Sequence, residues 1–121
     1  MITALHHFSI LTATEETVSF YEKLGFESYY RKDRTNDTII LMKGHGVEIE
    51  MFIDPRHPNR LAGIDEPLGP RHVAFEVDDI EKTAAELKAA DLSVGDIGTD
   101  WTGIRYCYIT DPDGNQVELH E

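Results

Sequence analysis

The sequence predicts an α+β fold built from two repeated β-α-β-β-β modules. The first observation is the order of hydrophobic periods: segments that alternate like strands and segments with the apolar period of a helix follow the order strand, helix, strand, strand, strand, twice. The second is a stretch at residues 54–70 that holds four of the five prolines. We therefore expect one domain of 121 residues, with modules at about 1–53 and 71–121 joined by this loop.

The first module begins with alternation in residues 5–11, which predicts a strand. Thr14 is expected to cap a helix over about residues 15–24, and Gly25 is a natural residue to end it. The hydrophobic pattern then predicts three further strands, near residues 26–32, 38–43 and 47–53.

The second module repeats this order. A strand is expected over residues 71–77, and Asp78 is expected to cap a helix from about residue 79 to residue 90. Further strands are expected near residues 92–94, 105–110 and 116–120. The sequence DPDG at residues 111–114 predicts a tight turn before the last of them.

Candidate metal ligands fall on equivalent positions of the repeat. A shift of 65 residues places His7 on His72, and a shift of 68 residues places Glu50 on Glu118. Since strand side chains alternate between faces, all four are expected on the polar face of a sheet, and the apolar residues of the same strands are expected on the other face, against the helices. Any one of them alone is more simply interpreted as a polar residue in water. The same two residue types at the same two positions in both modules favour a metal site.

Composition excludes several classes of partner. The net charge is −12 and no cluster of Lys and Arg interrupts it, so we expect neither nucleic acid nor an anionic membrane surface as a partner. No apolar run approaches the roughly 20 residues that span a bilayer. The single cysteine, Cys107, is interpreted as a buried strand residue and suits a reducing compartment. We expect a cytoplasmic protein that acts on a small molecule.

Four segments of the chain form recognisable motifs: residues 5–10 (LHHFSI), 20–26 (FYEKLGF), 71–80 (RHVAFEVDDI) and 111–119 (DPDGNQVEL). They resemble the vicinal oxygen chelate superfamily, which includes glyoxalase I, bleomycin-resistance proteins, fosfomycin-resistance transferases and extradiol dioxygenases. The resemblance covers essentially the whole chain and implies the glyoxalase fold, in which two such modules form a metal-binding cleft. The motifs are more specific for the fold than for an activity, because members differ in chemistry on one scaffold.

By motif position, the resemblance to bacterial glyoxalase I implies that His7, Glu50, His72 and Glu118 hold one divalent metal ion. Two imidazoles and two carboxylates suit Ni²⁺, Zn²⁺, Co²⁺ or Mn²⁺. A substrate with neighbouring oxygens can chelate at the remaining positions, where the ion acts as a Lewis acid. The resemblance implies Glu118 as the proton acceptor and Glu50 as its possible partner.

The expected function is a metal-dependent lyase or isomerase of the glyoxalase I type, similar to lactoylglutathione lyase, acting on a substrate such as the hemithioacetal of a 2-oxoaldehyde. Three alternatives stay open. An isomerase like methylmalonyl-CoA epimerase usually has Gln at the position of Glu50. Antibiotic-binding resistance proteins lack the ligands, and dioxygenases use two His and one Glu.

One departure bears on the co-substrate. Bacterial glyoxalase I has an Arg shortly after the first His to hold the glutathione carboxylate, and Leu11 stands there in this chain. The identity of the thiol therefore stays open; the substitutes considered are Arg56, Arg60, Arg71 and Arg105. The resemblance also implies a homodimer with its sites where modules meet, formed within one chain or across two.

Other side chains receive simpler interpretations. Tyr106 and Tyr108 are expected to belong to the strand core, His45 to a solvated turn, and His120 to the exposed end of the last strand. Trp101 is expected either to cover the cleft or to anchor its loop.

Overall fold

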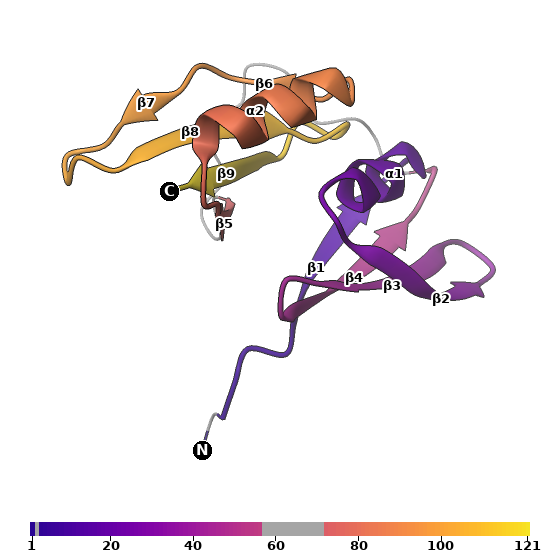
Figure 1. Cartoon of the computed structure of the whole chain (residues 1–121). Helices are drawn as coiled ribbons and strands as arrows, with labels where there is room; N and C mark the ends of the chain where they lie inside the picture. The colour runs from indigo at the N-terminus through magenta and orange to yellow at the C-terminus, as the bar shows by residue number, and fades with distance from the viewer. Residues whose placement is uncertain (2, 57–71) are drawn as a thin grey trace. The chain divides into compact units, whose positions relative to one another are not determined.

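The computed structural model describes residues 1, 3–56 and 72–121, and divides the chain into two compact units. Unit 1 is Met1–Asn59 and unit 2 is Arg60–Glu121. In each unit one helix lies on one sheet (Figure 1). Most of the expected connection at 54–70, and the start of the strand expected at 71–77, lie outside the described residues. Within the described part of the chain, no helix is long and apolar enough to cross a membrane.

The two units share one topology, which confirms the repeated modules. In unit 1 the sheet order is β1-β4-β3-β2, with β1 parallel to β4. In unit 2 it is β5-β9-β8-β6, with β5 parallel to β9, and β7 also pairs with β8. Unit 1 contains β1 (His7–Thr12), α1 (Glu16–Lys23), β2 (Glu27–Asp33), β3 (Thr38–Gly44) and β4 (Val47–Ile53). Unit 2 contains β5 (Val73–Glu76), α2 (Ile80–Ala89), β6 (Ser93–Val94), β7 (Gly98–Thr99), β8 (Arg105–Thr110) and β9 (Gln116–His120).

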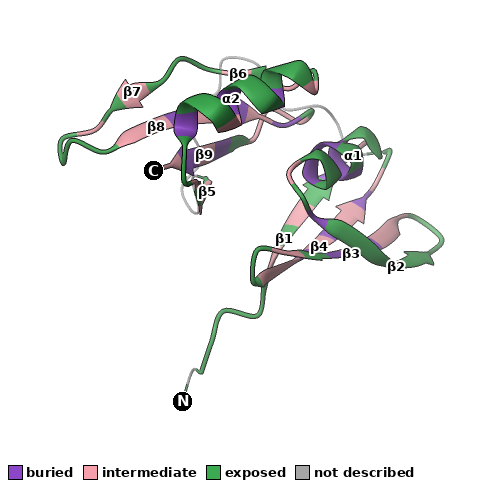
Figure 2. Cartoon of the chain, viewed as in Figure 1, coloured by how far each residue is buried: buried purple, intermediate pink, exposed green. Residues whose placement is uncertain are grey.

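Each sheet buries the face that its helix covers, while β2 is exposed along its whole length (Figure 2). The apolar residues of the covered face are the best-buried residues of both units. The candidate ligands Glu50 and Glu118 lie on the opposite face of their sheets. The core of unit 1 comprises Val18, Phe20, Tyr21, Phe26, Ile40, Met42, Ile49, Met51 and Ile53; that of unit 2 comprises Ile80, Ala84, Leu87, Cys107, Ile109, Val117 and Leu119.

Both helices begin one residue later than expected. The side chain that caps α2 belongs to Asp79, not Asp78, and it accepts the N–H of Lys82 at 3.0 Å. At α1 the cap position is Glu15, without a side-chain cap, although the hydroxyl of Thr14 accepts the N–H of Glu16 at 3.2 Å. Asp78 and Asp79 are equally good caps by residue type, so the sequence pattern does not distinguish them. Only the backbone angles decide that Asp79 caps α2.

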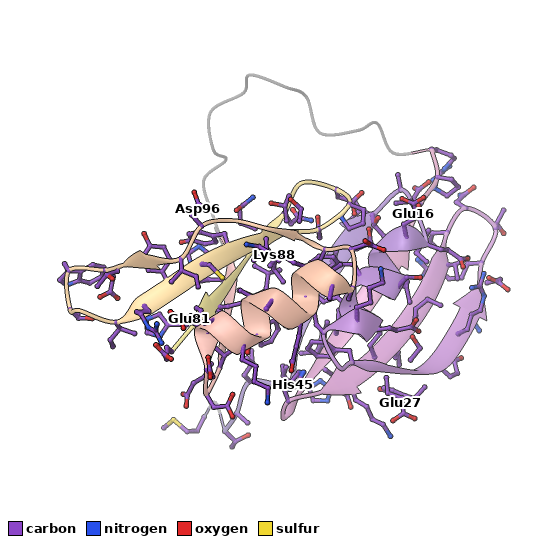
Figure 3. The ribbon with its side chains drawn as sticks, turned by 45° about the horizontal axis from the view of Figure 1, so that its top comes forward. Glu16, Glu27, His45, Glu81, Lys88 and Asp96 are labelled. Atoms are coloured by element: carbon purple, nitrogen blue, oxygen red, sulfur yellow. The ribbon has the colours of Figure 1, made fainter. Side chains whose placement is uncertain are left out.

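His45 lies exposed in the β3–β4 turn, as expected, but two contacts also hold it there. Its Nε2 lies 2.6 Å from the carbonyl oxygen of Leu24, and its ring meets the Phe26 ring edge-on at 5.1 Å (Figure 3). Gly25, at φ +93°, ends α1 as expected and leaves room for this contact, since a Cβ there would lie 3.1 Å from the imidazole. His45 therefore fastens the β3–β4 turn to the end of α1.

Replacing Asp111 with alanine is expected to lower the free energy of unfolding by about 2–4 kcal/mol. Asp111 is 3% exposed and accepts hydrogen bonds from the N–H groups of Asp113 and Asn115 and from the Asn115 side chain, at 3.0, 2.8 and 2.9 Å. These bonds close the β8–β9 turn, and their loss removes the acceptor of partly buried N–H groups. Urea denaturation measures the difference.

The matched control is Asp96→Ala, which removes the same charge from an exposed position between β6 and β7 (Figure 3). It is expected to change stability by less than about 0.5 kcal/mol. Equal losses in the two variants would show that charge, not the buried turn, explains the effect.

Candidate metal-binding residues

In unit 1, His7 and Glu50 lie on the same face of neighbouring strands. The parallel β1–β4 register pairs His7 with Glu48 and Ser9 with Glu50. His7 and Ser9 share a face because they are two residues apart, so His7 is diagonal to Glu50. The Ser9 hydroxyl donates to the backbone carbonyl of Glu50 at 3.0 Å and links the two strands further.

In unit 2, His72 and Glu118 are in direct contact. The imidazole Nε2 lies 2.8 Å from the Glu118 carboxylate, and the two side chains are 24% and 14% exposed. The parallel β5–β9 register pairs Ala74 with Glu118, so His72 lies two residues before the partner of its glutamate. His7 stands in the same relation to Ser9 and Glu50. The two His–Glu pairs thus occupy the same diagonal of equivalent strand pairs.

These donors have the chemistry that a divalent transition-metal ion accepts. Imidazole nitrogen and carboxylate oxygen are ordinary ligands of Zn²⁺, Ni²⁺, Co²⁺ and Mn²⁺. Each unit supplies one such pair. Within residues 1, 3–56 and 72–121, no group of three or more His, Cys, Asp or Glu side chains is gathered at one point.

Tyr108 lies on the ligand face of unit 2, the sheet face that carries Glu118, although it was not expected there. Tyr106 and Tyr108 were expected in the strand core, but the register places them opposite His120 and Glu118 on the ligand face. The Tyr108 hydroxyl donates to Glu118 Oε2 at 3.4 Å, and its ring meets the His72 ring edge-on at 5.4 Å. The alternation with Cys107, which is buried, was the available signal.

His120 is half-exposed, but it is not isolated in solvent. Its Nε2 lies 3.6 Å from Oδ2 of Asp100 in the β7–β8 hairpin. Hydrogen bonds chiefly from the Thr102 hydroxyl, and also from the N–H groups of Ile104 and Thr102, hold the pKa of Asp100 below its usual range, and His120 lowers it further. Trp101, at the tip of this hairpin, is 94% exposed, so it does not anchor the loop among the described residues.

The ligand face of unit 1 is more apolar than expected. Leu41 is paired with Glu50, and the next row along the strands contains Leu11, Phe52 and Ile39. The expectation of a polar face was wrong here, because β1 and β4 carry large apolar residues on both faces. Glu50 consequently lies among side chains that favour a partly water-excluded environment.

Two of the four arginines considered as carboxylate-binding substitutes lie within the described residues, and both form ion pairs. Arg105 lies on the helix-covered face, where it binds Glu121 at 2.6 and 2.8 Å and Glu81 of α2 at 3.0 Å (Figure 3). Arg56 pairs with Asp54 at 2.9 Å. Arg60 and Arg71 lie outside the described residues.

The family model for the Glyoxalase/Bleomycin resistance protein/Dioxygenase superfamily matches residues 4–119. The chain belongs to this superfamily. Among its relatives in the superfamily, the uncharacterized protein YwkD of Bacillus subtilis (strain 168) is 33% identical, over 100% of this chain and 98% of YwkD. The uncharacterized protein YaeR of Escherichia coli (strain K12) is 36% identical, over 97% of this chain and 95% of YaeR.

Solved structures of the superfamily agree with this assignment. A glyoxalase family protein from Enterococcus faecalis has a TM-score of 0.86 and 34% identity, covering 98% of this chain and 97% of that protein. The fold alone is shared with lactoylglutathione lyase from Agrobacterium tumefaciens, with a TM-score of 0.72 and 22% identity over 99% of this chain and 94% of the lyase. It is also shared with an E126Q mutant of the fosfomycin resistance protein FosX from Listeria monocytogenes, in complex with Mn(II). The TM-score is 0.76 and the identity 20%, over 99% of this chain and 92% of FosX.

Proposed function

We propose that the chain is a divalent-metal-dependent lyase or isomerase of the glyoxalase I type, with His7, Glu50, His72 and Glu118 as the metal ligands. The observation that carries this proposal is the equal register of the two His–Glu pairs in equivalent strand pairs. Membership of a superfamily that contains metal-dependent enzymes supports it. The proposed substrate presents neighbouring oxygens, as the hemithioacetal of a 2-oxoaldehyde does.

A divalent ion in this set supplies Lewis acidity toward the substrate oxygens. The proposed role of Glu118 is to accept the proton that leaves carbon. Contacts of Oε2 with His72 and Tyr108 restrain this carboxylate and so limit the geometries it can adopt. Glu50, among the side chains of Leu41 and Phe52, is the proposed partner that returns a proton on the other side.

The test begins with untagged protein purified without a chelator. We expect bound Ni²⁺, Co²⁺, Zn²⁺ or Mn²⁺ by elemental analysis, and isomerisation of the methylglyoxal hemithioacetal with glutathione or with a second thiol. Removal of the ion should abolish turnover, and its return should restore it. Protein that binds no divalent ion would contradict the metal site. A metal-loaded protein that is inactive with every thiol would contradict the lyase assignment and leave the epimerase and binding alternatives.

Homodimer assembly and a cytoplasmic location stay predictions from the resemblance and the composition. Sedimentation of the metal-loaded protein at micromolar concentration tests the first. A single species with the mass of one chain, 13.7 kDa, would contradict it.

A further inference from the structure

The turn after β2 places a guanidinium group on the same sheet face as Glu50. The Arg34 Cζ lies 5.7 Å from the centre of the Phe52 ring. Phe52 and Glu50 are two residues apart on β4 and therefore project from one face. A cation stacked on Phe52 thus lies beside the row of side chains that includes Glu50.

The orientation of this guanidinium is fixed by Asp37. Nε donates to Oδ1 at 2.6 Å and Nη2 donates to Oδ2 at 2.5 Å, which is the fork geometry of a bidentate pair. These bonds use two of the five N–H donors that an arginine carries, and the others remain for a further acceptor. The side chain of Arg34 is 45% exposed, so an acceptor from solution can reach it.

Arg34 and Glu50 are close enough to interact electrostatically. The hydrogen bond to Asp37 raises the pKa of Arg34 most, the charge of Asp37 adds to it, and the negative charge of Glu50 adds a further increase. This interaction agrees with the position of the guanidinium beyond Phe52, on the side of the sheet that carries the proposed ligand.

Two other cations lie in this region, and each has its own acidic neighbour: Lys43, on the same face, is paired with Glu48 in the strand register, and Arg56 binds Asp54 after the end of β4. Leu41 is paired with Glu50 and Phe52 lies in the next row, and the protein as a whole carries a net charge of −12, which repels anions. Arg31, on β2 three residues before Arg34, lies on the helix-covered side, where it binds Glu15 at 2.8 Å. An anion that binds this face therefore needs a local, oriented donor group.

We propose that Arg34 binds a carboxylate of the substrate while the neighbouring oxygens of the same substrate occupy the metal site. This inference rests on the proposed function. Glu50 and Phe52 are two positions apart on β4, a distance of roughly 7 Å along the strand, so the carboxylate should lie only a few bonds from the chelating oxygens. The substrate class is accordingly a short, carboxylate-bearing vicinal-oxygen compound.

The experiment compares two chelating probes on the Ni²⁺-loaded protein by calorimetry. Acetohydroxamate provides neighbouring oxygens alone, and the monohydroxamate of succinate adds a carboxylate a short distance away. The wild type is expected to bind the succinate probe at least about 10-fold more tightly, since a charge-assisted fork is stronger than a neutral contact. In Arg34→Gln the preference should fall below about 2-fold, and Arg34→Lys should fall between, because it keeps the charge and loses the fork.

Arg31→Gln is the matched control. It removes one ion-paired guanidinium of similar exposure, 47% against 45%, from the opposite face. It should keep the wild-type preference for the succinate probe. Loss of the preference in Arg31→Gln as well, or its survival in Arg34→Gln, would overturn the role of Arg34. Equal binding of both probes by the wild type would also overturn it, whereas failure of acetohydroxamate to bind at all would overturn the proposed function and this inference with it.

Discussion

Glu118→Gln is expected to retain metal and to lose turnover by about 100-fold or more. The amide keeps the size of the side chain and one oxygen donor, but it cannot accept a proton. An amide oxygen can keep both the contact with His72 and the hydrogen bond from the Tyr108 hydroxyl, so the local fold should persist. Metal content and the rate of hemithioacetal isomerisation, measured on the same preparation, separate the two effects.

Glu76→Gln provides the control for this variant. Glu76 is exposed, lies on the same sheet face and is paired with His120 in the β5–β9 register. The same loss of charge there should leave turnover within about 2-fold of the wild type, as expected for an exposed side chain that touches no substrate. If Glu118→Gln keeps its metal and works at the wild-type rate, Glu118 is not the proton acceptor.

His72→Ala and His7→Ala are each expected to weaken metal binding by at least about 100-fold, because even loss of a group that only supports a ligand costs 10- to 100-fold. The equal register of the two pairs predicts losses of similar size. Competition with a chromophoric chelator measures the affinity. Far-ultraviolet circular dichroism checks that each variant is folded.

His120→Ala tests whether any histidine on this face would have the same effect. His120 lies two residues after Glu118 on β9 and contacts Asp100 of the hairpin instead of a ligand. Metal affinity should stay within about 3-fold of the wild type, since this histidine is not a proposed ligand. An equal loss in His120→Ala would mean that the ligand set has been assigned wrongly. Wild-type affinity in His7→Ala would remove unit 1 from the set.

Several features of the fold were predictable because they depend on local pattern. The 2-residue and 3.6-residue periods predicted both helices and every described strand except β7 within a few residues, and the repeat order predicted two modules of one topology. The Asp111 turn and the Gly25 helix end carry strong local signals, and both occur as expected. Such features need no knowledge of what packs against them.

Side-chain contacts between segments that are distant in sequence could not be predicted from the local pattern. The sequence correctly places His45 in an exposed turn, but its contact with the carbonyl oxygen of Leu24, twenty-one positions away, depends on the chain returning to the end of α1. Tyr108 reads as core because aromatic residues in strands are usually buried, and its neighbours across the register decide its face. Arg34 has no sequence signal at all, since its position depends on the β2–β3 turn folding over Phe52.

By itself the sequence determined the repeat, the alternation of faces and the four candidate ligands, His7, Glu50, His72 and Glu118, because these follow from periodicity and from equivalent positions. The tertiary structure decided the strand register, and the register makes each His–Glu pair a diagonal of the same form. It also decided which side chains surround those pairs, such as Tyr108 beside Glu118. The physical reason is that periodicity fixes the direction of a side chain relative to its own backbone, whereas its neighbours are fixed only when strands distant in sequence exchange hydrogen bonds.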